Sequence, residues 1–142
     1  MKNLKWTMGI LFIGTITIIG CSKNQKVVKS LEGEWRATSF KEDGFEWIVD
    51  DSLVITYTWN SCKVENEDCS GSYSLSHPDI GTGTSAFTYS ISSDGTIISV
   101  DFASPDLVDM DKMTIDEQTE TKFSFSGFDV DGYYMEIEME KQ

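Results

Sequence analysis

From residue 34 to the C-terminal end, hydrophobic and polar residues alternate with a period of two. This is the repeat of a β-strand that turns one side to a core and the other to water. Serine and threonine fill many of the polar positions, and no segment here keeps a helical period for longer than a turn or two. The apolar positions of the two clearest runs are Leu53, Ile55, Tyr57 and Trp59, and then Tyr133, Met135, Ile137 and Met139.

The alternation predicts eight strands that are joined by short connections. Asp-Gly pairs at 43–44, 94–95 and 131–132 supply the positive φ angles that tight hairpins need. We therefore expect an all-β domain, an eight-stranded antiparallel up-and-down barrel, because closure removes exposed strand edges. A two-sheet β-sandwich is the alternative. The strands are expected near residues 33–40, 52–59, 70–76, 86–92, 95–102, 112–117, 121–127 and 132–140.

Closure makes a specific prediction about the first and last strands. They should pair antiparallel, with Phe40 opposite Tyr134 and Arg36 opposite Glu138 on the outer face. Opposite charges across two strands contribute about 0.2–1 kcal/mol.

The first twenty residues have the order of a secretory signal peptide. Lys2 and Lys5 form a positive start, residues 6–19 are mostly apolar, and the small Gly20 precedes Cys21. A membrane-spanning helix needs about 18 or more apolar residues, and this run is shorter. We therefore expect residues 1–20 to be removed, with a short uncleaved membrane anchor as the alternative.

Residues 18–21, Ile-Ile-Gly-Cys, resemble the lipobox of bacterial lipoproteins. The resemblance implies that Cys21 is acylated and becomes the mature N-terminus. Ser22 resembles the residue found at this position in outer-membrane lipoproteins, so it implies a lipid anchor in the outer membrane, facing the periplasm or the cell surface.

Residues 21–30 are then expected to form a lipidated tether that could reach roughly 30 Å when extended, at about 3.3 Å per residue. The segment from residue 22 to residue 30 carries Lys23, Lys26 and Lys29 and no acid. These lysines either touch anionic lipid headgroups or stay in water.

The domain at 31–142 resembles the lipocalins. The run Leu-Glu-Gly-Glu-Trp at 31–35 is similar to the opening of small bacterial lipocalin-like lipoproteins, and the Gly-Ser-Tyr run at 71–73 is similar to their strand after a cysteine-bearing hairpin. The resemblance implies an eight-stranded barrel, in some members with a ligand inside. Lipocalins often carry an arginine on the last strand that packs over the tryptophan, whereas residues 132–142 contain only Lys141.

Charge and cysteine content narrow the range of partners and chemistry. Without Lys2 and Lys5, 9 basic residues remain against 24 acidic ones, a formal charge of −15. Such a chain repels phosphate backbones, so we expect no nucleic-acid partner. Cys62 and Cys69 are expected to form a disulfide in an oxidising compartment, which stabilises the fold by about 2–3 kcal/mol.

The sequence offers little for catalysis or metal binding. His77 is the only histidine and is expected in a loop, with no nucleophile motif beside it. The Asp-Val-Asp-Gly run at 129–132 lacks the spacing and final glutamate of a calcium loop, so a plain turn is expected. We expect no enzyme activity, metal or cofactor.

A ligand site is the main functional possibility. Large apolar side chains on the inward positions either line a cavity or fill the core. The candidates are Trp47, Tyr57, Tyr73, Phe87, Tyr89, Phe102, Phe125 and Met135.

The two ends of the expected barrel should differ. Trp35 and Trp59 are expected to pack together as a floor, with the disulfide loop just beyond. The opposite end, the mouth, collects the connections at 41–51, 77–85, 103–111 and 128–131, with Lys41 as the one lysine or arginine. Their acids are Glu42, Asp43, Glu46, Asp50, Asp51, Asp79, Asp106, Asp109, Asp111, Asp129 and Asp131. An acidic mouth attracts cations and rejects anions, whereas a merely solvated rim does neither.

Two functions therefore remain open. One is a membrane-anchored lipocalin-like lipoprotein that binds a small apolar or cationic amphipathic ligand. The other is an acidic interaction module that docks a basic partner protein.

Overall fold

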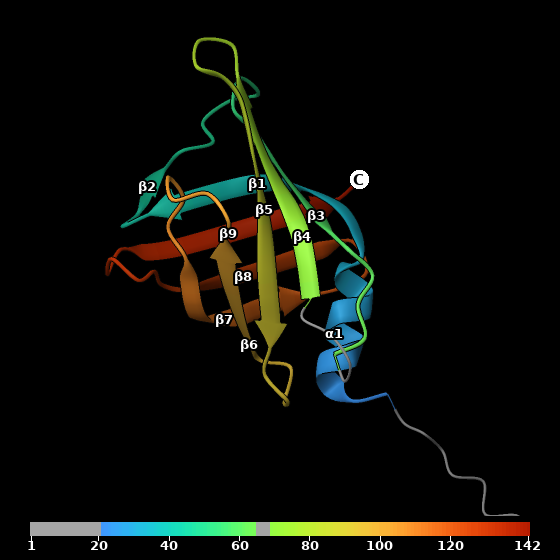
Figure 1. The fold of residues 1–142 in the computed structure, drawn as a ribbon. Coiled ribbons are helices and arrows are strands. Elements are labelled where there is room, and N and C mark those ends of the chain that lie inside the picture. Colours follow the sequence, from blue (N-terminus) through green and yellow to red (C-terminus); the bar gives the residue numbers. More distant parts are fainter. Residues whose placement is uncertain (1–20, 65–68) are drawn as a thin grey trace, which may run out of the picture.

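A computed structural model describes residues 21–64 and 69–142 (Figure 1). The predicted signal peptide, residues 1–20, lies outside the described residues. Within them, one helix precedes nine strands. In chain order the elements are α1 (Lys23–Leu31), β1 (Gly33–Glu42), β2 (Phe45–Glu46), β3 (Val54–Trp59), β4 (Cys69–His77), β5 (Gly81–Ile91), β6 (Ile97–Phe102), β7 (Met110–Gln118), β8 (Lys122–Phe128) and β9 (Tyr134–Lys141).

The sheet closes on itself. From β3 to β9 each strand pairs antiparallel with the next, β3 also pairs with β1, and β9 returns to pair with β1. The result is a closed eight-stranded antiparallel up-and-down barrel, with β2 as an extra strand on β1. This confirms the predicted fold class and excludes the two-sheet sandwich. All eight predicted strands are present, because hydrophobic and polar residues alternate between the inner and outer sides of a barrel wall.

The register between β1 and β9 differs from the prediction. Arg36 lies opposite Glu140, two residues further along β9 than predicted. Phe40 lies opposite Ile137, three residues further, because a bulge between Ala37 and Ser39 shifts the register of β1 by one more residue. A bulge adds one residue to one strand and reverses which positions face inward. The predicted pairs, Phe40 with Tyr134 and Arg36 with Glu138, are therefore wrong.

The bulge is held by a side chain from β2. The Glu46 carboxylate accepts hydrogen bonds from the backbone N–H of Phe40 and Ile48, each at 2.9 Å, and from the Ser39 hydroxyl. Phe40 consequently turns toward the interior, although the uninterrupted pattern placed it outside.

Aromatic rings fill the half of the barrel that adjoins α1. The Trp59 ring lies 4.8 Å from the Tyr89 ring and 4.9 Å from the Phe87 ring, measured between centroids. Gly71 makes room for this cluster, because a Cβ atom there would lie 2.3 Å from the Phe87 ring and 2.4 Å from the Thr58 carbonyl oxygen. The glycine of the Gly-x-Tyr run is therefore a packing requirement.

Residues 23–31 form a helix that closes one end of the barrel (Figure 1), so the predicted extended tether is wrong. Val27, Val28 and Leu31 are buried, and their spacing of one, three and four residues places them on one helical face. The helix is short, and helices of this length gain most of their stability from packing.

The expected tryptophan floor is also wrong in its details. Trp35 and Trp59 are both buried, but each packs against Phe123, at 6.3 and 6.5 Å between ring centroids. The Trp35 indole N–H donates to the Leu31 carbonyl oxygen at 2.7 Å. The floor is therefore α1, and the tryptophans form the layer above it.

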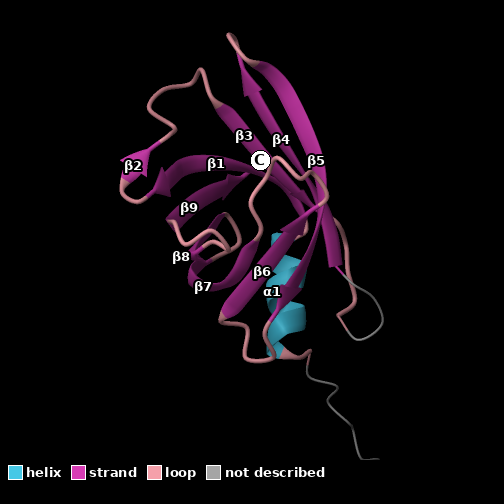
Figure 2. Cartoon of the chain, turned by 60° about the vertical axis from the view of Figure 1, so that its left-hand side comes forward, coloured by secondary structure: helices cyan, strands magenta, loops and turns pink. Residues whose placement is uncertain are grey.

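Hairpins and one irregular loop surround the other end, the mouth (Figure 2). The turn from β1 to β2, the turn from β8 to β9 and the loop at 103–109 lie there. The β4–β5 hairpin projects past the barrel wall (Figure 1). Because β5 already begins at Gly81, most of the predicted loop at 77–85 is strand.

Candidate functional site

A cavity of about 190 Å³ lies inside the mouth. Its side walls come from β1, β3, β4, β6, β7 and β9, and residues of the loop at 103–109 cover it. Most of the contact surface is apolar, which suits a hydrocarbon or aromatic group. The lining residues are Phe40, Glu42, Tyr57, Tyr73, Phe102, Asp106, Leu107, Val108, Met110, Asp129, Met135 and Ile137.

Two tyrosines and a phenylalanine form one wall of the cavity. The rings of Tyr57 and Tyr73 lie 5.3 Å apart, and those of Tyr73 and Phe102 lie 5.7 Å apart, in edge-to-face contact. Burial raises the pKa of Tyr57 above its usual range, with a further contribution from Tyr73, and burial raises the pKa of Tyr73 to about 12. Both hydroxyls are therefore protonated at neutral pH and can donate a hydrogen bond to a ligand.

Three carboxylates line the cavity, from three different mouth segments. Glu42 ends β1, Asp106 lies in the loop at 103–109, and Asp129 follows β8. Asp129 is only 8% exposed, and its Oδ1 accepts the backbone N–H groups of Asp131 at 3.0 Å and Tyr133 at 2.9 Å. Since the lining contains no lysine, arginine or histidine, the field in the cavity favours cations.

A second hollow of about 280 Å³ adjoins the cavity. Tyr73, Asp106 and Leu107 line both spaces, so these side chains separate them. The loop that carries Leu107 is fixed by Asp109, whose carboxylate accepts the Phe102 N–H at 2.7 Å. The Val130 N–H donates to the Asp109 carbonyl oxygen at 3.3 Å, which links the loop to the β8–β9 turn.

Large apolar side chains are exposed on the segments around the mouth. We call them the apolar rim: Phe45, Trp47, Val108, Phe128, Val130, Tyr133 and Tyr134. Phe45 is 62% exposed and Phe128 is 64% exposed. Two hydrogen bonds join the hairpins that carry them, from the Asp43 N–H to the Tyr134 carbonyl oxygen at 2.8 Å and from the Tyr134 N–H to Asp43 Oδ1 at 2.9 Å. Large exposed apolar patches are typical of binding surfaces, so the apolar rim is a candidate for one.

The predicted lining residues fall into three groups. Tyr57, Tyr73, Phe102 and Met135 line the cavity. Phe87, Tyr89 and Phe125 are buried in the core outside that lining. The prediction for Trp47 is wrong, because this residue lies outside the cavity lining. It is 46% exposed, packs on Phe45, and its indole N–H donates to Glu42 at 3.1 Å. It follows the two-residue strand β2, which is too short for an alternating pattern to reveal.

The eleven predicted mouth acids are dispersed. Glu42, Asp106 and Asp129 line the cavity, and Glu46 and Asp109 hold the backbone beside it. The others lie in turns and on outer surfaces.

Among those others, Asp50 accepts the Ser52 N–H, and Asp51 pairs with Arg36 at 3.3 Å on the outside. Asp111 accepts a hydrogen bond from Ser99 on the outer wall. Asp79 lies in the turn between β4 and β5.

The cysteines and the histidine are the other residues with distinctive chemistry. Cys62 and Cys69 form the predicted disulfide. Cys21 has a free thiol and is exposed just before α1. His77 Nδ1 accepts the Asp79 N–H at 3.1 Å within the β4–β5 turn. Across residues 21–64 and 69–142, no group of three histidine, cysteine, aspartate or glutamate side chains is arranged to hold a metal ion.

Lys141, at the end of β9, lies over the Trp35 ring. Its Nζ lies 5.4 Å from the centre of the Trp35 ring and donates to the Ser30 carbonyl oxygen at 3.2 Å. The cation–π contact connects the last strand to the first strand, and the hydrogen bond connects it to α1.

Comparisons with known proteins identify the fold and no more. No known family and no curated protein matches the chain. Among solved structures, a redesigned β-barrel matches with a TM-score of 0.60 and 12% identity, over 82% of this chain and 95% of that one. The chain is an eight-stranded up-and-down β-barrel. Within its described part, no helix is long and apolar enough to cross a membrane.

Proposed function

We propose that this barrel is a lipocalin-like lipoprotein, anchored in the outer membrane by acylated Cys21, that binds a small apolar or cationic amphipathic ligand. The observation that carries the proposal is the cavity at the mouth. Its walls are apolar, and three carboxylates line it without a compensating cation. An amphipathic cation matches both features, because its apolar group is buried while its charge meets the carboxylates.

The size of the cavity limits the ligand. At about 190 Å³ it is smaller than the roughly 300–1,000 Å³ of common ligand sites. A short alkyl or aromatic group fits inside, and the rest of the molecule lies at the rim or in the adjoining hollow beyond Leu107. Fatty acids and other carboxylate ligands fit poorly, because their charge would lie beside Glu42, Asp106 and Asp129.

Titration calorimetry with two amphiphiles of equal chain length tests the ligand class. Decyltrimethylammonium should bind more tightly than decyl sulfate at low salt, and the difference should shrink at high salt as screening increases. Asp106→Asn should reduce the difference, whereas Asp111→Asn, which removes the same charge from the outer wall, should leave it unchanged. Tighter binding of decyl sulfate at low salt would contradict the proposal.

The anchor has a separate test. The lipobox-like run ends at Cys21, which is exposed and outside the disulfide. A fatty-acid probe supplied to cells that express the full chain should label the protein, and Cys21→Ala should remove the label. Labelling that persists in Cys21→Ala would refute acylation at this residue.

The apolar rim favours a second candidate function, the docking of a basic protein. Phe45, Phe128 and Val130 are exposed beside carboxylates such as Asp43 and Asp131. A partner surface of aliphatic residues ringed by lysine and arginine would bury the apolar rim and pair with these acids. Such binding would survive a bulky residue that fills the cavity, whereas ligand binding would not.

A further inference from the structure

The connection between Cys21 and the folded barrel is very short. Helix α1 begins at Lys23, so only Ser22 lies between Cys21 and the helix. Two residue steps reach about 7 Å at most. Any membrane anchor at Cys21 therefore brings α1 itself to the membrane surface.

The helix is bonded firmly to the barrel. The Gln25 side chain donates to the Cys62 carbonyl oxygen at 2.9 Å and accepts the Val64 N–H at 3.1 Å. Gln118 Nε2 donates to the Ser30 hydroxyl at 2.6 Å. With Val27, Val28 and Leu31 buried below it, α1 cannot swing away without opening the floor of the barrel.

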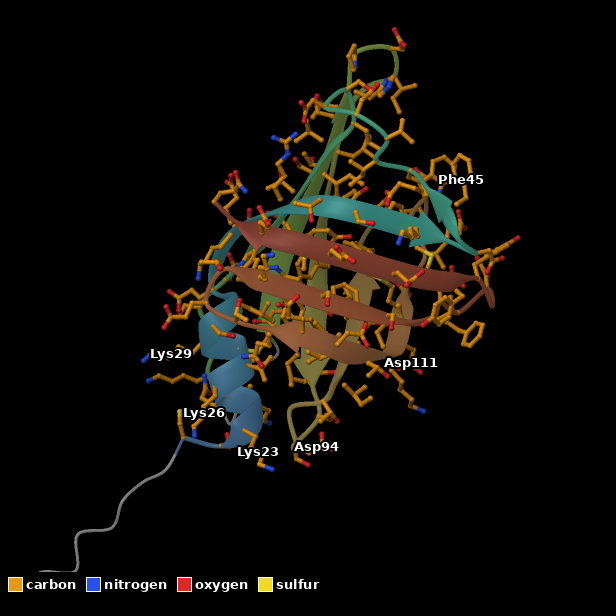
Figure 3. The ribbon with its side chains drawn as sticks, turned by 180° about the vertical axis from the view of Figure 1, so that it is seen from behind. Lys23, Lys26, Lys29, Phe45, Asp94 and Asp111 are labelled. Atoms are coloured by element: carbon orange, nitrogen blue, oxygen red, sulfur yellow. A yellow bond between two sulfur atoms is a disulfide. The ribbon has the colours of Figure 1, made fainter. Side chains whose placement is uncertain are left out.

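The side of α1 that faces away from the barrel is basic. Lys23, Lys26 and Lys29 are three residues apart, so they share one helical face, and all three are exposed (Figure 3). Two ion pairs join described residues to one another, Arg36–Asp51 and Lys112–Asp111, and neither involves α1. The nearby Asp94 carboxylate accepts hydrogen bonds from Ser92 and Thr96 within its own turn. The three ammonium groups are thus available to an external anion.

We propose that the lysine face of α1 lies on anionic lipid headgroups and holds the barrel with its mouth pointing away from that membrane. This inference rests on the proposed function, because the anchor at Cys21 is what brings α1 to the membrane. The occupant follows from charge and from chain length: an acyl group on Cys21 enters the bilayer two residues before Lys23, the first of these lysines. Each lysine near an anionic surface strengthens the contact.

The opposite end supports the same orientation. The mouth carries Glu42, Asp106 and Asp129 together with the apolar rim, and Figure 3 shows Phe45 far from the lysine face. An anionic surface repels those carboxylates, so the mouth would not face it. A ligand must then arrive from the aqueous side or from a partner, and not directly from the bilayer that holds the anchor.

Energy transfer from a fluorophore on the protein to acceptor-labelled headgroups measures the orientation. The full chain is expressed, processed and reconstituted into vesicles of phosphatidylcholine with or without phosphatidylglycerol. One fluorophore is attached at Asp94→Cys, beside α1, and another at Phe45→Cys, at the mouth. We expect strong transfer from position 94 and weak transfer from position 45 in anionic vesicles.

Charge variants identify the cause of the orientation. Replacing Lys23, Lys26 and Lys29 together by glutamine should reduce the difference between the two positions, because the anchor at Cys21 then keeps α1 near the membrane without fixing the tilt of the barrel. Lys112→Gln, which removes one exposed charge from the barrel wall, should leave it unchanged. Equal transfer from both positions in the parent protein, or a difference that the triple variant keeps in full, would overturn the proposal.

Co-sedimentation separates this proposal from the proposed anchor. If the protein does not sediment with phosphatidylcholine vesicles, the anchor is absent. The lysine face then still predicts binding to vesicles that contain phosphatidylglycerol. The affinity for these vesicles should fall about fivefold per lysine removed and about 100-fold in the triple variant. If the protein sediments with both kinds of vesicle but transfer is equal at the two positions, the anchor stands and the orientation is wrong.

Discussion

The two ends of this barrel are built on different principles. At the helix end, Val28, Leu31 and Trp35 are almost completely buried, and side-chain hydrogen bonds connect α1 to the barrel. At the mouth, Phe45 and Phe128 are exposed, and carboxylates lie beside apolar walls. The helix end is thus closely packed, whereas the mouth leaves apolar and acidic side chains exposed. Substitutions at the two ends should therefore have effects of different kinds.

The largest effect is expected at Trp35. It is fully buried, packs on Phe123, donates to Leu31 and carries Lys141 over its ring. Removal of a large buried aromatic side chain leaves a cavity, so Trp35→Ala should lower the free energy of unfolding by about 3–5 kcal/mol. Urea denaturation followed by circular dichroism measures this. A loss below about 1 kcal/mol would show that the helix end is not the stable half.

The disulfide should have the next largest effect. Cys62 and Cys69 close a short loop beside α1, and the Cys62 carbonyl oxygen accepts the Gln25 side chain. Replacing both cysteines by serine frees the unfolded chain from this constraint and should lower stability by about 2–3 kcal/mol. Urea denaturation of the parent and of the double variant, each with and without reductant, measures this loss. If reductant lowers the free energy of unfolding of the parent no more than that of the double variant, the disulfide does not stabilise the fold.

Leu107 at the mouth should affect binding more than stability. It is half-buried between the cavity and the adjoining hollow, so Leu107→Ala should lower stability by about 1 kcal/mol, less than a fully buried leucine would. The variant should merge the two spaces and tighten the binding of the longer of two cationic amphiphiles. Calorimetry with chains of eight and twelve carbons tests this, and an unchanged ratio of affinities would place the ligand elsewhere.

Trp47 should have the smallest effect on stability. It is 46% exposed on the hairpin at the mouth, and surface substitutions usually change stability by no more than about 0.5 kcal/mol. Trp47→Ala is therefore the counterpart of Trp35→Ala in the same assay. A loss comparable to that of Trp35→Ala would remove the distinction between the two ends.

Strand positions could be read from the sequence because each wall residue faces either the core or water. That parity also places Tyr57, Tyr73 and Met135 inside. It fails after Ala37, where the bulge turns Phe40 and Glu42 into the cavity, because the sequence carries no mark of the extra residue. Leu107 and Val108 belong to an irregular loop, and a loop has no period from which to predict their direction.

Helix α1 escaped prediction for a different reason. Its three buried residues are surrounded by lysines, and the segment is too short to be helical in isolation. The helix forms because the open end of the barrel offers Val27, Val28 and Leu31 a surface to cover. Such an element depends on tertiary contacts that a local pattern does not contain.

The pairing of β1 with β9 also has a consequence for how the molecule folds. The Thr38 hydroxyl donates to the Glu138 carbonyl oxygen, and these residues are 100 positions apart in the chain. A contact of such long range is formed only after a large loss of chain entropy, so proteins rich in such contacts fold slowly. Until β9 arrives, β1 keeps an unpaired edge that can bind other chains. Closure is therefore expected to be a late, slow step. Dilution or a chaperone should reduce aggregation through the unpaired edge of β1 before closure is complete.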